Sequence, residues 1–400
     1  MARGTVFDFE PLLSSDAVAR RGPGVDAAGA SNPKPMIQIA GGQPDPASMP
    51  VRELAAAAAR VLSSDRAALL YGPRDGFAGL KQVVVEKTAA LERLRVTPDD
   101  LIVTNGSSQA IAMSAQAILD RGDPILIDEF SWGVRIFSGF GATMLPVRYD
   151  RHGPIPEDLE AGVAAADAMG RRVKMFYTLP NFQNPMGVTT SVERRLAVLE
   201  IAARHGFPIL EDDAYFELRF EGEHLPSYFE LDESRSMVIR TGTFSKILGA
   251  GVRLGWAMAP RDLLRVLLLY KLDLGASPFT SRIVAEYMRE HMLEHIDELV
   301  GVYRRKRDTM LDGLESGLEG LASWDRPEGG FFVWVRLPAG GDAREVDLAC
   351  ETRGVAIWTG ADFDPAGADA RHARLCYSFA TPEEIERGVA TFCDVVRALA

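Results

Sequence analysis

The strongest constraint on the fold is an alternation, between residues 101 and 259, of short apolar runs with amphipathic helical segments. Six of these runs predict buried strands: LIVT (101–104), PILIDE (124–129), VKMFYTLP (173–180), FPILEDD (207–213), SMVIRTGTF (236–244) and RLGWAMA (253–259). Helical patterns, SSQAIAMSAQAIL and SVERRLAVLEIAARH, follow the first and third runs. Strands and helices in this order predict an α/β fold with a mostly parallel sheet covered on both faces.

The flanking sequence predicts two further units. Residues 1–50 are rich in Gly, Pro, Ala and Asn and predict an irregular N-terminal arm. From Ser281 a long helical pattern begins, and the strands FFVWVRL and RLCYSFA and the helix EEIERGVATFCDVVRAL follow it. We therefore expect a large domain over residues 51–285 and a smaller α/β C-terminal domain over residues 286–400.

Charge and composition exclude several classes of partner. The net charge of −12 argues against a nucleic-acid or anionic-membrane binder, because both need a basic surface. The three cysteines form no CxxC pair, and HMLEH (291–295) is interpreted as a solvated helix face, so we expect no metal site. No apolar run has membrane-spanning length, and the first residues contain acids and a proline where a signal peptide needs apolar residues. A cytoplasmic protein is the expectation.

Chemically versatile side chains follow the predicted strands, and in such sheets ligands bind at the carboxyl ends of the strands. Asn105-Gly-Ser-Ser follows LIVT, Trp132 follows PILIDE, and Asn184 lies in NFQNPMG after VKMFYTLP. FPILEDDAY contains Asp212 and Tyr215, and SMVIRTGTFSK ends on Lys246. Such a set suits pyridoxal 5'-phosphate (PLP). Its aldehyde needs a lysine, its pyridine nitrogen a carboxylate, and its phosphate a helix N-terminus with hydroxyls and an arginine.

From GGQPDPASMP near residue 41 to its end, the chain resembles the class I/II aminotransferases, which are PLP enzymes of fold type I. Within them it is most similar to the α-aminoadipate and kynurenine aminotransferase group. The motifs that carry the resemblance are GGQPDP, YGPRDG (71–76), GSSQ (106–109), QNPMG, EDDAY, TFSK (243–246), the arginine of GVRLG, RLCYS and PEGGFFVW. The resemblance implies a large PLP-binding domain with a mostly parallel sheet and a smaller C-terminal domain.

The resemblance also implies a role for each matched residue. Lys246 forms the Schiff base, Asp212 faces the pyridinium nitrogen, and Tyr215 and Asn184 bond the ring oxygen. The phosphate is bound by Ser107, Ser108, Thr243, Ser245 and Arg253. Trp132 stacks on the ring, Gly42 lines the substrate side and Arg374 takes the substrate carboxylate. The family's phosphate-binding tyrosine matches Tyr71, which implies a homodimer in which the partner subunit donates it.

The implied reaction moves the amino group of an L-α-amino acid to a 2-oxo acid through Lys246. Two alternatives remain. One is a PLP-dependent lyase, decarboxylase, oxidase or carbon–carbon bond-forming enzyme on the same fold. The other is a PLP-sensing transcription regulator, which the acidic charge and the short irregular region before GGQPDP disfavour.

Some segments depart from the family's pattern. Phe130, Trp132 and Ser108 replace the usual proline, tyrosine and glutamine, and the loop VAIWTGADF (355–363) replaces a PGxxF pattern near the substrate. Neither the identity of the amino acid nor that of the acceptor follows from these residues.

Overall fold

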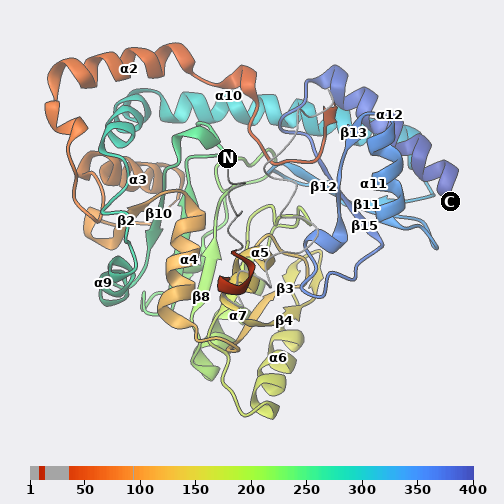
Figure 1. Ribbon diagram of the computed structural model, residues 1–400, viewed down its shortest axis with the longest axis horizontal. Coiled ribbons are helices and arrows are strands. Elements are labelled where there is room, and N and C mark those ends of the chain that lie inside the picture. Colours follow the sequence, from red (N-terminus) through yellow and green to blue (C-terminus); the bar gives the residue numbers. More distant parts are fainter. Residues whose placement is uncertain (1–8, 14–35, 93) are drawn as a thin grey trace, which may run out of the picture.

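A computed structural model describes residues 9–13, 36–92 and 94–400 of the 400-residue chain. Its centre is a seven-stranded sheet of order β2-β10-β9-β8-β7-β3-β4 (Figure 1). The strands are β2 (Leu101–Thr104), β3 (Pro124–Asp128), β4 (Thr143–Val147), β7 (Phe176–Thr178), β8 (Ile209–Asp212), β9 (Val238–Thr243) and β10 (Gly255–Met258). Only β10 is antiparallel to its neighbours in this sheet. The expected α/β class and mostly parallel sheet are therefore confirmed.

Six of the seven strands of the central sheet are wholly buried because helices cover the sheet. Every residue of β2, β3, β7, β8, β9 and β10 is buried. The surrounding helices are α3 (Ala78–Leu91), α4 (Ser107–Ile118), α5 (Val134–Phe140), α6 (Pro156–Ala168), α7 (Val192–His205), α8 (Tyr228–Leu231) and α9 (Arg261–Leu269). Helix α4 packs against β8, β9 and β10, so its first residues lie at the carboxyl edge of the sheet.

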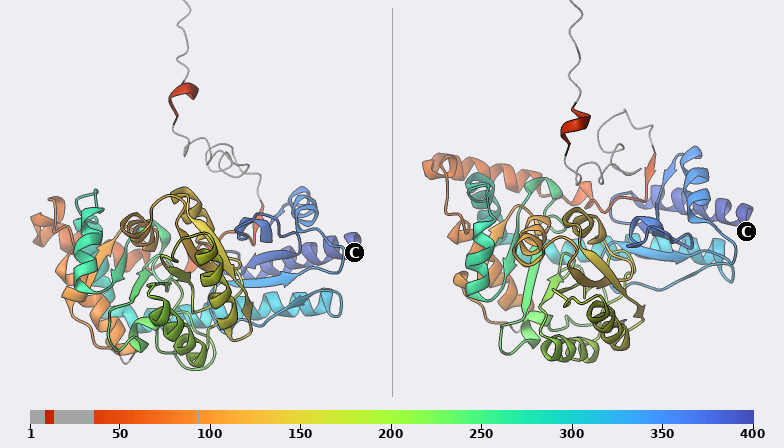
Figure 2. Two further views of the ribbon diagram at one scale, coloured as in Figure 1. Left: turned by 90° about the horizontal axis from the view of Figure 1, so that it is seen from below. Right: turned by 60° about the horizontal axis from the view of Figure 1, so that its bottom comes forward.

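A single long helix connects the central sheet to the C-terminal elements. Helix α10 (Pro278–Leu318) begins after Ser277, whose hydroxyl accepts a hydrogen bond from the Thr280 amide. It packs on α2 (Val51–Ser64), α3 and α12 (Pro382–Leu399). In both views of Figure 2 this helix runs from the central part of the molecule to the C-terminal elements.

The C-terminal part contains its own four-stranded antiparallel sheet. Its order is β11-β12-β15-β14, with β11 (Ser323–Trp324), β12 (Phe332–Arg336), β14 (Trp358–Thr359) and β15 (His372–Cys376). Helices α11 (Ala343–Thr352) and α12 pack together beside it. The expected domain boundary after residue 285 lies inside α10, so the division of the chain into domains stays a prediction.

Residues 37–39 join this C-terminal part. Strand β1 (Ile37–Gln38) pairs in parallel with β13 (Val355–Ala356), and the Cys376 amide donates to the Ile39 carbonyl. Residues 37–39 of the predicted irregular arm are thus paired with the C-terminal part. Most of the earlier residues of that arm lie outside the described ones.

Two local sequence interpretations need correction. Strand β4 (TMLPV) has no counterpart among the expected strands. It is an edge strand whose residues are mostly half-exposed, and Pro146, which is unusual inside a strand, interrupts its short apolar run. The solvated-face interpretation of HMLEH is wrong at His295. This residue is buried, and its Nε2 lies 2.6 Å from the Ile247 carbonyl oxygen. Within residues 9–13, 36–92 and 94–400, no helix combines the length and apolar character needed to cross a membrane.

The start of α4 depends on a glycine in the neighbouring strand. A Cβ atom at Gly255 would lie 2.6 Å from the Gly106 carbonyl carbon and 2.7 Å from the Ser107 nitrogen. These are backbone atoms, so they cannot shift without moving the start of α4 with them. We predict that Gly255→Ala lowers the free energy of unfolding by roughly 1–3 kcal/mol, as overpacking does.

Urea denaturation of the apo-protein measures this change, with Gly251→Ala as the matched control. A Cβ atom at Gly251 would have no heavy atom within 4 Å. Equal midpoints for the two variants would contradict the packing argument.

Candidate active site

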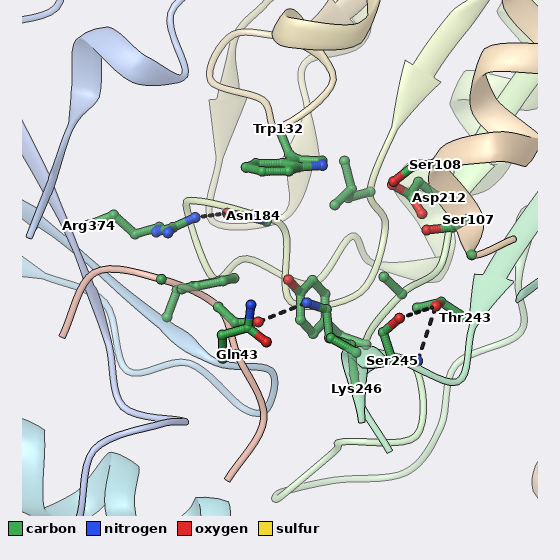
Figure 3. Close-up of a pocket in the computed structure, with 18 of the residues that line it drawn as sticks. Gln43, Ser107, Ser108, Trp132, Asn184, Asp212, Thr243, Ser245, Lys246 and Arg374 are labelled. Carbon is green, nitrogen blue, oxygen red and sulfur yellow. Dashed lines mark hydrogen bonds between the residues drawn. The ribbon is translucent and has the colours of Figure 1, made fainter. Parts of the chain in front are cut away.

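The matched residues converge on one cavity of about 310 Å³ between the two sheets. It is lined by residues at the carboxyl ends of the central strands, by residues 41–43 and by the C-terminal sheet (Figure 3). All of the site residues implied by the resemblance line this cavity except Tyr71. They are Gly42, Ser107, Ser108, Trp132, Asn184, Asp212, Tyr215, Thr243, Ser245, Lys246, Arg253 and Arg374.

Lys246 lies shortly after β9 and reaches the middle of the cavity. Its Nζ donates a hydrogen bond of 2.8 Å to the Gly42 carbonyl and lies 5.6 Å from the centre of the Tyr215 ring. Burial lowers the pKa of Lys246 to about 8. At pH 7 roughly a tenth of this amine is therefore neutral, and thus nucleophilic, which is far more than for an ordinary lysine.

Asp212 is the last residue of β8 and is buried on the cavity wall. Its carboxylate accepts hydrogen bonds from the Tyr177 hydroxyl (2.8 Å) and the Thr241 hydroxyl (3.2 Å). Burial raises the pKa of Asp212 to about 6, against the effect of these two donors. The carboxylate is thus mostly ionised at pH 7 and can hold a proton on a facing ring nitrogen.

An anion cradle lies where α4 begins. Gly106 precedes the helix, and no side chain caps its first turn, so the amides of that turn remain available for an anion. Ser107 and Ser108 open the helix. The Arg253 guanidinium lies beside them, 3.4 Å from where a Cβ of Gly106 would be. Across the cradle, the Thr243 hydroxyl lies 2.9 Å from the Ser245 hydroxyl. These groups suit a phosphate.

Arg374, on β15, closes the other end of the cavity. Its Nη1 donates to Asn184 Oδ1 (2.8 Å) and its Nη2 donates to the Ala40 carbonyl (2.6 Å). Its Nε is buried and has no partner among the described residues. Burial lowers the pKa of Arg374 to about 10, so the guanidinium stays charged at neutral pH. A substrate carboxylate would complete its hydrogen bonds.

Tyr215, Asn184 and Trp132 lie between these two ends. Burial raises the pKa of Tyr215 well above its usual value, so the phenol keeps its proton and can donate it in a hydrogen bond. Trp132 stacks on Trp358 with ring centres 5.9 Å apart. The chain turns at Gly133, where a Cβ would lie 2.3 Å from the Tyr177 ring. Glycine at this position therefore lets the Trp132 loop approach the sheet.

Tyr71 lies outside its own chain's cavity. It follows the short helix η4 (Arg66–Leu69), and 87% of its surface is exposed. Its predicted role therefore needs a second subunit, and it stays a prediction.

The structure adds cavity residues that the sequence argument did not single out. Gln43, Phe332 and Trp358 also line the cavity, and Tyr177, which does not line it, donates a hydrogen bond to Asp212. Trp358 lies in the loop 355–363, whose departure from the family's pattern was the available signal. No such signal marks Tyr177 in the sequence, because it lies within an apolar run that is typical of a core strand.

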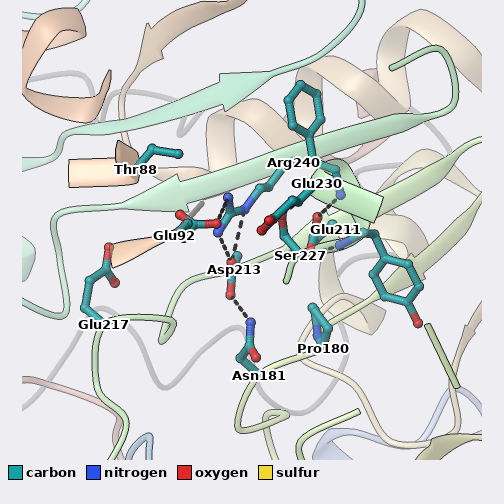
Figure 4. A network of polar contacts seen from close by, with 12 residues as sticks. Thr88, Glu92, Pro180, Asn181, Glu211, Asp213, Glu217, Ser227, Glu230 and Arg240 are labelled. Carbon is teal, nitrogen blue, oxygen red and sulfur yellow. Dashed lines mark hydrogen bonds and ion pairs between the residues drawn. The ribbon is translucent and has the colours of Figure 1, made fainter. Parts of the chain in front are cut away.

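A buried ionic network lies around Arg240, next to the strand end that carries Asp212, and Figure 4 shows its members Arg240, Asp213 and Glu92. Arg240 pairs with Asp213 (2.5 Å) and with Glu92 (2.6 Å), and Asn181 donates to Asp213 (2.8 Å). Glu211 and Arg240 are register partners, as are Asp212 and Thr241. Successive residues of a strand face opposite sides, so the network occupies the face of the sheet away from Asp212 and Thr241.

Comparisons with known proteins agree with this geometry. The family model for aminotransferase class I and II matches residues 34–392. The chain is 33% identical over 361 residues to the 2-aminoadipate transaminase of Thermus thermophilus, a match covering 88% of both proteins. It is 32% identical over 369 residues to aromatic-amino-acid aminotransferase 1 of Thermococcus litoralis, covering 90% of this chain and 88% of that relative.

A solved structure is also similar over its whole length. LysN, an α-aminoadipate aminotransferase from Thermus thermophilus, in complex with N-(5'-phosphopyridoxyl)-L-leucine, superposes with a TM-score of 0.90 at 30% identity. The match covers 98% of this chain and 99% of that one. The chain therefore belongs to the class I and II aminotransferases, with the fold type I architecture.

Proposed function

We propose that this aminotransferase holds PLP in the cavity and moves the amino group of an L-α-amino acid to a 2-oxo acid. The observation that carries the proposal is that a lysine amine, a buried carboxylate, an uncapped helix N-terminus and a buried guanidinium meet in one cavity. When bound, PLP supplies an electron sink that stabilises negative charge at the α-carbon of the substrate.

The described residues fit each part of the cofactor. Asp212 would hold the pyridine nitrogen protonated, and Tyr215 and Asn184 would donate hydrogen bonds to the ring oxygen. Trp132 would cover one ring face. The phosphate would be held at the start of α4 by Ser107 and Ser108, and from the other side by Thr243, Ser245 and Arg253.

The substrate would be oriented by Arg374 and deprotonated by Lys246. A bidentate contact between the guanidinium and the α-carboxylate fixes the position of the α-carbon. The Lys246 Nζ, with its pKa lowered to about 8, is the base that can take the α-proton and later return it. The Gly42 carbonyl, which accepts from Nζ, holds the amine in place.

A homodimer that places Tyr71 in the neighbouring cavity is part of the proposal. Large apolar side chains are exposed on two segments: Leu69, Leu70 and Tyr71 on one, Leu269, Leu272 and Leu274 on the other. The loops that follow them meet, because a Cβ at Gly275 would lie 2.9 Å from the Pro73 carbonyl oxygen. An exposed apolar surface of this kind is typical of a subunit interface. The cytoplasmic location remains a prediction.

A half-reaction tests the activity. We expect the PLP-loaded protein, mixed with a panel of L-amino acids without any oxo acid, to yield equal amounts of pyridoxamine phosphate and the matching 2-oxo acid. Chromatography after acid quenching measures both. Lys246→Ala is the control and should yield neither. A decarboxylated amine or a new carbon–carbon bond would instead favour the lyase or bond-forming alternative.

The pH dependence of PLP capture tests the lysine. Because only the neutral amine attacks the aldehyde, the rate of capture by the apo-protein should rise as the pH passes through about 8. At pH 8 roughly half of Lys246 is neutral, against less than about 1% of an ordinary lysine. Stopped-flow absorbance follows the reaction. A rate that keeps rising beyond pH 10 would show that burial leaves this pKa unchanged.

Subunit mixing tests the position of Tyr71. We predict that Tyr71→Ala and Lys246→Ala, each inactive alone at limiting PLP, regain activity when unfolded and refolded together. In a mixed dimer one cavity would combine the intact lysine of one subunit with the intact tyrosine of the other. Random pairing then restores about a quarter of the wild-type activity. If Tyr71 acts within its own chain, the mixture stays inactive.

A further inference from the structure

One buried histidine on the long helix α10 has no role in the chemistry described above. His295 is 5% exposed, and its Nε2 lies 2.6 Å from the carbonyl oxygen of Ile247, the residue that follows Lys246. A carbonyl oxygen can only accept a hydrogen bond, so Nε2 carries the proton. Burial lowers the pKa of His295, so at pH 7 the ring is neutral and this is its single N–H group.

This hydrogen bond fixes the backbone directly after Lys246. The residues Ser245–Leu248 form a turn at the end of β9. Within the turn, the Leu248 amide donates to the Phe244 carbonyl, whereas the described residues offer the Ile247 carbonyl no donor besides His295. Any shift of that carbonyl moves the backbone from which the lysine side chain extends.

The same face of α10 also binds the segment that carries Gly42. Tyr303 and Lys306 follow His295 by about two and three helical turns, so the three side chains lie on one face of the helix. All three are buried. The Tyr303 hydroxyl accepts a hydrogen bond of 3.0 Å from the Asp45 amide, and Lys306 Nζ donates one of 2.7 Å to Asp45 Oδ1. Asp45 lies shortly after Gly42 in the chain, so α10 holds this segment by two contacts.

The two segments held by α10 meet at the lysine amine. Lys246 Nζ donates its hydrogen bond of 2.8 Å to the Gly42 carbonyl. Along the helix axis, His295 and Lys306 are about 16 Å apart, because each residue adds about 1.5 Å. The backbone hydrogen bonds of the helix keep this rise constant. The helix therefore sets the spacing between the turn that carries Lys246 and the segment that carries Gly42.

We propose that His295 is a positioning residue for Lys246, and that α10 is a frame that sets the lysine amine against the Gly42 carbonyl. His295 forms one end of this frame, and Tyr303 and Lys306 form the other. A lysine amine that a substrate has displaced then returns to one defined place, where it can act as the base. The inference rests on the proposed function only for the chemistry of Lys246.

Two variants of equal side-chain length test the hydrogen bond. His295→Gln places an amide N–H where Nε2 lies, whereas His295→Met fills the same space without a donor. A small displacement of a reacting group can slow a reaction up to about a hundredfold, so we expect His295→Met to capture PLP about tenfold more slowly than wild type. His295→Gln keeps the hydrogen bond and should stay within about twofold of the wild-type rate. Stopped-flow absorbance measures both rates.

Labelling of the apo-protein gives a readout that needs neither PLP nor turnover. Trace acetylation with acetic anhydride over a range of pH, followed by mass spectrometry, reports the midpoint at which Lys246 becomes neutral. Burial lowers the pKa of Lys246, and so this midpoint, to about 8 in the wild type. A loosened turn lets water reach the amine, so in His295→Met the midpoint should rise by about one pH unit, whereas His295→Gln should leave it in place. A variant that is less stable but still folded would keep the wild-type midpoint.

The other end of the frame has its own variant. Tyr303→Phe keeps the ring and removes the oxygen that accepts from the Asp45 amide, so it should raise the labelling midpoint of Lys246 as well. An unchanged midpoint in this variant would show that α10 does not connect the Gly42 segment to the lysine, and would overturn the frame.

Steady-state kinetics separate positioning from substrate binding. His295→Met should lower kcat about tenfold and leave the KM for the amino acid within about twofold, because Arg374 is unchanged. His291→Met is the matched control. His291 lies one turn earlier on α10, has a side chain 40% exposed, and contacts the Tyr287 ring as His295 does. This control should behave as wild type.

Three further results would overturn the inference: a wild-type rate of capture in His295→Met, equal losses in His295→Gln and His295→Met, or an unchanged labelling midpoint in His295→Met. Failure of the proposed function is a separate outcome. In that case no amino acid yields a 2-oxo acid, while the labelling midpoint of the apo-protein still reports on His295.

Discussion

The buried guanidinium of Arg374 makes the contacts on which one end of the cavity depends. It belongs to the C-terminal sheet, yet it bonds Asn184 beside the central sheet and the Ala40 carbonyl at the start of the chain. Removing such a charge from water costs several kcal/mol. Its hydrogen bonds and the rings of Phe332 and Trp358, 4.1 and 4.6 Å away, offset that cost. One charge therefore fixes three distant segments relative to one another, including residues 40–42, which hold Lys246.

The central sheet and most of the cavity could be predicted from the sequence, because both depend on local patterns. Buried parallel strands are continuous apolar runs, and the residues that follow them must meet at one edge of the sheet. The parts that could not be predicted depend on long-range pairing. Strand β4 is mostly half-exposed and pairs with β3 on one side alone. Tyr177 looks like a core residue in the sequence, and only the structure shows that its hydroxyl donates a hydrogen bond to Asp212. In the sequence, Trp358 is marked only by lying in a loop that differs from the family's usual pattern. Its stacking on Trp132 could not be predicted, because the two residues are far apart in the chain.

Three consecutive acidic residues, Glu211, Asp212 and Asp213, lie at the end of β8, where their negative charges repel one another. The fold reduces this repulsion by placing Asp212 on one face of the sheet and the other two on the opposite face. Asp212 faces the cavity, whereas Asp213 is neutralised by Arg240 and Glu211 accepts the amides of Tyr228 and Phe229 at the start of α8. Burial still raises the pKa values of Glu211 and Asp212. Without the Arg240 pairing, the charge on Asp213 would raise the pKa of Asp212 further. The ionisation of Asp212 thus depends on a network whose residues do not line the cavity.

The pairing of β1 with β13 also has a consequence for biosynthesis. Ile37 lies beside Val355, and the acceptors for Lys246 and Arg374 are the carbonyls of Gly42 and Ala40. A chain emerging from the ribosome therefore contains Lys246 long before Arg374 of β15, which anchors residues 40–42, has been synthesised. The central sheet can form during translation, but the cavity closes only after the last strands are released. The final surroundings of Lys246 are thus confined to chains in which β15 has been made.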